Sequence, residues 1–201
     1  MNNSIELRKF EERDIDFIFR CKNDEKINSM IVGHHNYFSF EDSVTWVHNC
    51  MKGDRIDLKY WAICTNDQEQ RIIGWVCLSE IDHTNKSACH NGIVISDKEY
   101  NDGYAMFEVM LMSMVYAFED LSLNRLYGYC LSCHSISSHL LLSLGFTLEG
   151  KRRESIYRNG KYLDVSCFSI LQKEYFEYKN EGDYKLNKLV NKFVKSKKTP
   201  K

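Results

Sequence analysis

A strand that runs through a short glycine-containing loop into a long helix is the feature that most constrains this chain. The β-branched residues 93–95 favour a strand, and apolar residues recur at helical spacing over residues 106–121. A loop that leads directly into a helix presents unpaired backbone N–H groups at the positive end of the helix dipole. Gly103 lets a ligand approach that backbone closely. Residues 100–105 therefore predict a site for a phosphorylated ligand.

Further motifs follow this helix in a set order. They are Leu123-Asn124-Arg125-Leu126-Tyr127-Gly128-Tyr129, then Ser137, then Leu144-Gly145-Phe146 and Glu149-Gly150. In order and spacing they resemble the Gcn5-related N-acetyltransferase (GNAT) superfamily, and within it the RimJ/RimL-type acetyltransferases. The resemblance extends over about residues 5–175, because residues 73–82 and 149–164 also match patterns that are typical of these proteins.

The resemblance implies a binding site for coenzyme A. In that family a loop of the form Arg/Gln-x-x-Gly-x-Gly/Ala binds the pyrophosphate, and a splayed central strand pairs with the pantetheine arm. Tyr100 stands in place of the usual arginine and Asn101 in place of the first glycine, while Gly103 is retained. Acetyl-CoA is thus the implied co-substrate. The residues implied to bind it are Ile93, Val94, Ile95, Tyr100, Asn101, Asp102, Gly103, Tyr104, Ala105 and His134.

Length and composition predict one domain, and the resemblance implies that this is an α/β domain of the α+β type over residues 1–175. A chain of 201 residues with 43% hydrophobic content can bury one sizeable core. Strands are predicted at residues 5–10, 60–64, 72–78, 88–96 and 165–171, with a further strand that includes Tyr127 and Tyr129 and is ended by the C-x-x-C string, and Asn159-Gly160 is predicted as a hairpin turn. Helices are predicted from Asp14 to Cys21, from Ser39 or Glu41 to Cys50, over residues 106–121, and over residues 138–144. The resemblance implies a mostly antiparallel sheet of about six to seven strands with a splayed central strand.

Acetyl transfer to an amine needs a group that removes a proton from the amine and donors that stabilise the oxyanion. Glu80, Asp82 and His90 are the candidate bases, and a hydrogen-bonded structural role is the alternative for His90. Many GNAT enzymes carry a tyrosine beside the coenzyme sulfur, but Leu141 occupies that position here. Ser137 is therefore the predicted hydroxyl near the thioester, with a helix N-cap as its other role.

The acceptor site of the resembling family lies between the first helices and the central strands. Residues 24–40 are predicted to be irregular there, and His34 and His35 either line the site or are solvated. Arg152 and Glu154 either touch the acceptor or belong to a solvated strand face. The sequence does not identify the amine.

Charge and hydropathy restrict the partners. The net charge of −1 gives no whole-molecule argument for binding nucleic acid or membranes. No apolar run reaches the roughly 18 residues of a membrane span. The first residues lack the apolar core of a signal peptide. We therefore expect a cytoplasmic protein that acts on a small-molecule or peptide amine, without a membrane partner and with nucleic acid disfavoured.

Eight cysteines are spread over strand-like and helical stretches, which favours buried free thiols over disulfides. The string Cys130-Leu131-Ser132-Cys133-His134 matches C-x-x-C-H, but it ends a strand and has no second ligand pair at a matching distance. We therefore interpret these thiols as accidental and expect no metal.

Residues 176–201 form a tail of distinct composition. Seven lysines occupy residues 185–201, and apolar residues recur at helical spacing from Tyr184 to Val194. The pattern predicts a basic amphipathic helix that docks on the domain, on a second subunit in a homodimer, or on RNA or a membrane surface.

These observations predict an acetyl-CoA-dependent N-acetyltransferase that acts by direct attack of a primary amine. Polyamines, amino sugars and protein N-termini are the acceptors considered. The alternatives are a non-catalytic acyl-CoA sensor or scaffold, since the usual tyrosine and the first loop glycine are absent, and a ribosome- or RNA-associated protein that acts through the lysine tail.

Overall fold

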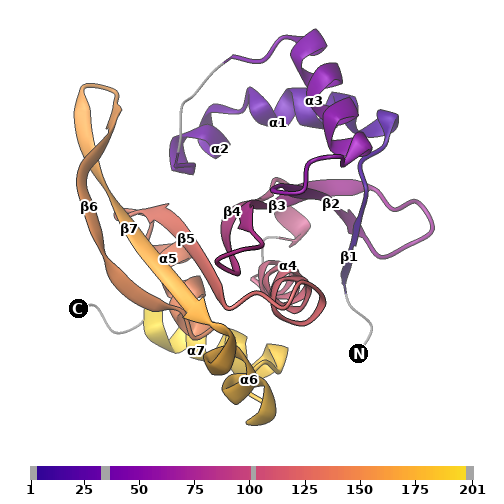
Figure 1. Ribbon diagram of the computed structural model, residues 1–201. Coiled ribbons are helices and arrows are strands. Elements are labelled where there is room, and N and C mark those ends of the chain that lie inside the picture. Colours follow the sequence, from indigo (N-terminus) through magenta and orange to yellow (C-terminus); the bar gives the residue numbers. More distant parts are fainter. Residues whose placement is uncertain (1–3, 33–36, 101–102, 198–201) are drawn as a thin grey trace.

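The computed structural model describes residues 4–32, 37–100 and 103–197 (Figure 1). The candidate residues His34, His35, Asn101 and Asp102 lie outside this part of the chain. Within it, seven strands form one sheet in the order β1-β2-β3-β4-β5-β7-β6. The strands are β1 Ile5–Arg8, β2 Lys59–Thr65, β3 Ile72–Asp82, β4 Ser87–Ile95, β5 Arg125–Leu131, β6 Thr147–Arg158 and β7 Lys161–Leu171.

Neighbouring strands are antiparallel except for β4 and β5, which are parallel. The predicted α/β class with a mostly antiparallel sheet is thereby confirmed. Gly74 explains part of the Ile73-Gly74 motif, because a Cβ at this position would lie 1.9 Å from the carbonyl oxygen of Val94. A side chain there would push β3 and β4 apart.

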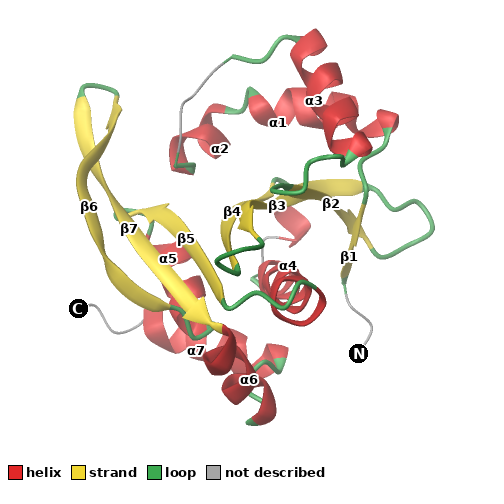
Figure 2. Ribbon diagram, viewed as in Figure 1, coloured by secondary structure: helices red, strands yellow, loops and turns green. Residues whose placement is uncertain are grey.

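Three helices cover one face of β1 to β4 (Figures 1 and 2). They are α1 Ile15–Lys22, α2 Glu25–Met30 and α3 Phe40–Lys52, and they bury Ile18 and Val47 against Ala62 and Trp75 of the sheet. α3 begins directly after Ser39, one of the two predicted starts, and its first turn carries a capping box between Ser39 and Asp42.

Two details of this layer differ from the predictions. Residues 24–40 are not wholly irregular, because Asp24 accepts hydrogen bonds from the backbone N–H groups of Lys26 and Ile27 and so caps α2. Asp14 does not cap α1 with its side chain. It is buried instead, with both carboxylate oxygens 2.8 Å from the guanidinium of Arg8.

The other face is covered by α4 Tyr104–Val115, the π-helical turn η3 Tyr116–Asp120, α5 Ser135–Ser143, α6 Gln172–Asn180 and α7 Leu186–Lys197. Phe107 of α4, Leu140 of α5 and Phe193 of α7 share one core. The predicted amphipathic tail helix therefore docks on its own domain. α6 spans residue 175, where the sequence suggests that the domain ends.

The hairpin of β6 and β7 extends beyond the rest of the sheet toward α2 (Figure 1). Its turn is formed by Asn159 and Gly160, with φ of 50° and 76°, as two left-handed residues should be in a tight hairpin. The predicted turn is confirmed.

Candidate active site

The parallel strands β4 and β5 part after three residue pairs. Ser87, Ala88 and Cys89 pair with β5, and Cys89 opposite Tyr127 is the last pair. Residues 93–95 pair only with β3 among the described residues, so one edge of their backbone faces the opening between β4 and β5. The register of β4 against β3 slips by one residue between His90 and Ile93, and Gly92 has a φ of 74°. This is the splayed strand with a bulge that the sequence predicts.

The loop before α4 ends at Gly103, which has a left-handed φ of 91° and takes the N-cap position. A Cβ at Gly103 would meet no atom within 4 Å. The backbone here is therefore open on one side, and the first-turn N–H groups of α4 lack intrahelical partners. Ala105 is buried in the core, so only its backbone is available to a ligand, whereas Tyr104 is exposed. Backbone donors and the positive end of the helix dipole give this terminus the features of an anion-binding site.

His134 and Ser137 lie together at the start of α5. Ser137 Oγ is 2.9 Å from His134 Nδ1, and burial lowers the pKa of His134. The N-cap role considered for Ser137 is wrong, because α5 begins at Ser135 with His134 in the N-cap position. Leu141 is buried, so α5 offers no phenol at that position.

Glu80 and Tyr127 form a second polar pair beside the point where β4 and β5 part. Glu80 has a φ of 52° within an irregularity of β3, and its Oε2 accepts a hydrogen bond of 2.8 Å from the hydroxyl of Tyr127. Burial and this bond raise the pKa of Tyr127. Arg152 lies over the ring of Tyr129, 3.8 Å from its centroid, so an aromatic and charged surface continues from Tyr127 toward β6.

His90 lies apart from this pair. It is buried with its Nε2 2.8 Å from the hydroxyl of Ser113 on α4, and burial lowers its pKa to about 4. Tyr127 lies on the opposite face of the sheet, because its neighbour Leu126 is buried against α4. His90 is therefore a neutral imidazole inside the core, the structural alternative considered for it. Asp82 instead caps a turn, where its carboxylate accepts from the backbone of Thr84 and Asn85.

Arg158 joins the β6–β7 hairpin to the end of α2. Its guanidinium donates to the carbonyl oxygens of Ser29 at 2.7 Å and Ile31 at 2.8 Å. This contact connects the first helices with the last strands across the side of the sheet on which Glu80 and Tyr127 lie. The sequence gives no sign of the contact, because Arg158 and its partners are far apart in the chain.

The remaining expectations concern thiols, metals and membranes. All eight cysteines are free thiols, and Cys133 of the C-x-x-C-H string is exposed while Cys130 is buried. Among the described residues, no group of His, Cys, Asp and Glu side chains is arranged to hold a metal ion. No helix in the described ranges is long and apolar enough to cross a membrane.

Comparison with known proteins identifies close similarities. The acetyltransferase (GNAT) domain family matches residues 4–147. Spermidine N(1)-acetyltransferase of Vibrio cholerae is 29% identical over 175 residues, which are 87% of this chain and 97% of that protein. The corresponding protein of Escherichia coli K12 is 25% identical over 90% of this chain and 93% of its own length. The crystal structure of the Vibrio cholerae enzyme with CoA and spermine superimposes with a TM-score of 0.76 and 26% identity, covering 86% of this chain and 98% of that one.

Proposed function

The chain belongs to the GNAT acetyltransferases and transfers an acetyl group from acetyl-CoA to an amine, and from this premise we propose that the amine is an aliphatic polyamine. One observation carries the proposal. The similarity to spermidine acetyltransferases extends over nearly their whole length. It therefore includes the elements from which both the coenzyme site and the acceptor site are built. Membership of the RimJ/RimL-type subgroup stays a prediction.

We propose that the coenzyme lies between β4 and β5 with its diphosphate at the start of α4. The backbone around Gly103 would donate to the diphosphate, and the free edge of residues 93–95 would pair with the pantetheine arm. Bound there, acetyl-CoA supplies the activated carbonyl. Ser137, held by His134, would place its hydroxyl near the departing sulfur. The predicted roles of Asn101 and Asp102 remain open for mutational test.

For the acceptor, we propose Glu80 as the group that receives the proton of the ammonium. The phenol of Tyr127 occupies one carboxylate oxygen of Glu80, which leaves the other oxygen for the amine. A carboxylate also attracts the positive charge that a polyamine carries at neutral pH. The buried position of His90 removes support for it as the base. Of the three candidate bases, Glu80 is therefore the one proposed to accept the proton, and its charge would also help to hold the polyamine.

The test is a panel of amines with the purified full-length chain. Spermidine, spermine, an amino sugar and a peptide with a free N-terminus are each incubated with acetyl-CoA. Because Cys133 is exposed and would react with thiol reagents, acetylated products are quantified by mass spectrometry. We expect a kcat/KM for spermidine or spermine at least about tenfold above the others, a difference of about 1.4 kcal/mol in transition-state binding. A preference for the peptide would contradict the proposal, and coenzyme binding without any turnover would favour the acyl-CoA sensor.

Three further expectations remain proposals. The eight free thiols suit a reducing compartment, in line with the expected cytoplasmic location. A homodimer is testable by light scattering of the purified chain. Nucleic-acid binding is disfavoured because α7 turns its apolar side to the domain and the net charge is −1.

A further inference from the structure

The ammonium group of Lys22 lies among three aromatic rings, which together form an aromatic box. Its Nζ lies 4.7 Å from the ring centroid of Trp46, 5.1 Å from that of Trp75 and 5.4 Å from that of Phe38. Among the ion pairs and hydrogen bonds of the described residues, none involves this ammonium. Ring faces are thus its observed partners, and burial lowers the pKa of Lys22. Three ring faces around one cation form a recognition site for alkylammonium groups.

The walls of this aromatic box are held in place without Lys22. Phe10 and Tyr60 pack edge-on against Trp46, with ring centroids 5.2 Å and 5.0 Å away. The side chain of Asn23 accepts from the backbone N–H of Phe38 and donates to its carbonyl oxygen, both at 3.0 Å. The box is therefore preorganised, and removal of the lysine would leave a vacant ammonium site rather than a collapsed one.

The box lies among the helices on the face of the sheet where the acceptor is proposed to bind. Lys22 is the last residue of α1, Trp46 belongs to α3, and Trp75 belongs to β3 beside the splayed strand β4. α1 and α3 belong to the helical layer over β1 to β4 (Figure 1), and Arg158 of the β6–β7 hairpin is bound to α2 of the same layer. Lys22 is only partly buried at the end of a helix, so rotation of its flexible four-carbon stem can carry the ammonium out to solvent.

We propose that the box of Phe38, Trp46 and Trp75 binds an ammonium group of the polyamine distant from the reacting amine, and that Lys22 is a tethered occupant which the substrate displaces. This inference rests on the proposed function. Chemistry supports the exchange, because the four-carbon stem and primary ammonium of lysine match the aminobutyl arm of spermidine. The swap keeps one positive charge in the box. A tethered occupant that fills the site nine-tenths of the time weakens the apparent affinity of a competitor about tenfold.

The experiment empties the box and measures binding of a cation that cannot be acetylated. Lys22→Ala, wild type and the control Lys26→Ala, an exposed lysine on α2, are titrated with tetramethylammonium. Trp46 and Trp75 are two of the three tryptophans, so fluorescence reports binding directly. We expect Lys22→Ala to bind at least about tenfold more tightly than wild type and Lys26→Ala to match wild type. Addition of Phe38→Leu to Lys22→Ala should weaken binding again, while circular dichroism shows that each variant folds.

Kinetics then test whether the acceptor uses the box. The KM for spermidine should fall several-fold in Lys22→Ala, and tetramethylammonium should compete with spermidine there. An unchanged tetramethylammonium affinity, or a spermidine KM that stays the same or rises, overturns the inference. If the wild type acetylates no polyamine, the proposed function fails on that result alone, and the tetramethylammonium titration still decides whether the box is an ammonium site.

Discussion

At the scale of single residues, the catalytic proposal depends on one carboxylate and the phenol that orients it. Glu80 adopts a left-handed backbone conformation that turns its side chain toward Tyr127, and the two are joined by a 2.8 Å hydrogen bond. Non-glycine residues seldom adopt this conformation, and such strain concentrates at functional sites. The local backbone therefore serves to aim the carboxylate.

Substitution of Glu80 should lower activity more than substitution of Tyr127. Glu80→Gln keeps the shape but removes the proton acceptor, so we expect kcat/KM to fall about 100-fold. Tyr127→Phe removes one hydrogen bond, so we expect a fall of about tenfold. Steady-state kinetics with spermidine measure both, and Glu177→Gln on α6 is the control. Equal activity of Glu80→Gln and wild type would exclude Glu80 as the base.

The buried His90 predicts how stability depends on pH. Its folded pKa of about 4 lies below the unfolded value of about 6.5. Below pH 6.5 the unfolded chain therefore gains a proton that the folded chain cannot take up, and stability falls until about pH 4. The loss should be about 1 to 3 kcal/mol between these limits.

The substitution His90→Gln removes this titration and retains a partner for the hydroxyl of Ser113. Urea unfolding at pH 7 and pH 5 should show a smaller loss for His90→Gln than for wild type. His83→Gln, in an exposed turn, should behave as wild type. Equal losses of stability in wild type and His90→Gln would mean that other groups cause the destabilisation at low pH.

At the scale of elements, local patterns predict some parts and not others. The start of α3 after Ser39 and the Asn159-Gly160 turn depend on neighbouring residues, and both agree with the predictions. The sequence does not predict α2, because this helix has only six residues and its last carbonyl groups are bound by Arg158 from the distant hairpin. The bond from Tyr127 to Glu80 joins residues 47 positions apart, and an irregularity in the register of β3 brings them together. Alternation places Tyr127 on a face of the sheet but cannot name its partner.

Substitution of Gly103, at the start of α4, can distinguish an effect on backbone strain from an effect on coenzyme binding. Gly103 and Gly160 both have left-handed φ values, 91° and 76°, and a Cβ at either would meet no atom within 4 Å. Alanine at each position should therefore cost a similar free energy of unfolding, roughly 1 kcal/mol. Only at Gly103 would the new methyl group project toward the proposed diphosphate site.

Calorimetry with acetyl-CoA distinguishes the two glycines. Gly103→Ala should raise the dissociation constant about tenfold, a loss of about 1.4 kcal/mol, while Gly160→Ala should leave it unchanged. Thermal unfolding measures the cost in stability for both variants. Equal coenzyme affinity of the two variants would refute the position assigned to the diphosphate.

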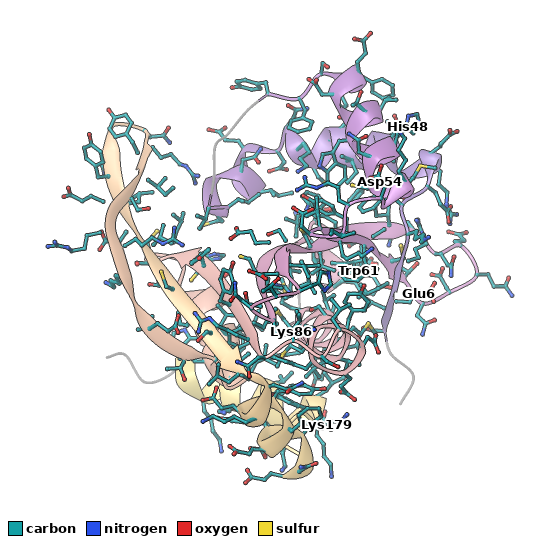
Figure 3. The ribbon with its side chains drawn as sticks, viewed as in Figure 1. Glu6, His48, Asp54, Trp61, Lys86 and Lys179 are labelled. Atoms are coloured by element: carbon teal, nitrogen blue, oxygen red, sulfur yellow. The ribbon has the colours of Figure 1, made fainter. Side chains whose placement is uncertain are left out.

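At the scale of the whole molecule, the helices form two layers, α1 to α3 on one face of the sheet and α4, α5 and α7 on the other (Figure 2). In the proposed arrangement the first layer would border the acceptor and the second would support the coenzyme. Side chains from the C-terminal segment, α6 and the residues after it, pack into the layer of α4, α5 and α7. Rings of Phe118, Tyr175, Tyr184 and Tyr178 stack in sequence with centroids 4.8, 5.4 and 5.9 Å apart, and Lys179, labelled in Figure 3, pairs with Glu119 at 2.6 Å.

This packing suggests that the tail positions α5. The hydroxyl of Tyr184 donates to the carbonyl oxygen of Leu144, and a Cβ at Gly145 would lie 2.9 Å from the ring of Tyr178. α5 carries Ser137 at its other end. A chain that ends at Gly182 should therefore unfold about 10 °C or more below the full chain, because it loses the buried Leu189 and Phe193.

Point variants keep this prediction testable if the truncated chain does not fold. Phe193→Ala should cost about 3 kcal/mol, whereas the adjacent Val194→Ala, which is exposed on the outer side of α7, should cost less than about 0.5 kcal/mol. Thermal unfolding gives both stabilities, and calorimetry gives the affinity for acetyl-CoA, which should weaken together with stability in Phe193→Ala because α7 packs against α5. A truncated chain that keeps full stability and full coenzyme affinity would mean that the domain ends near residue 175 and that the lysine-rich segment is a separable appendage.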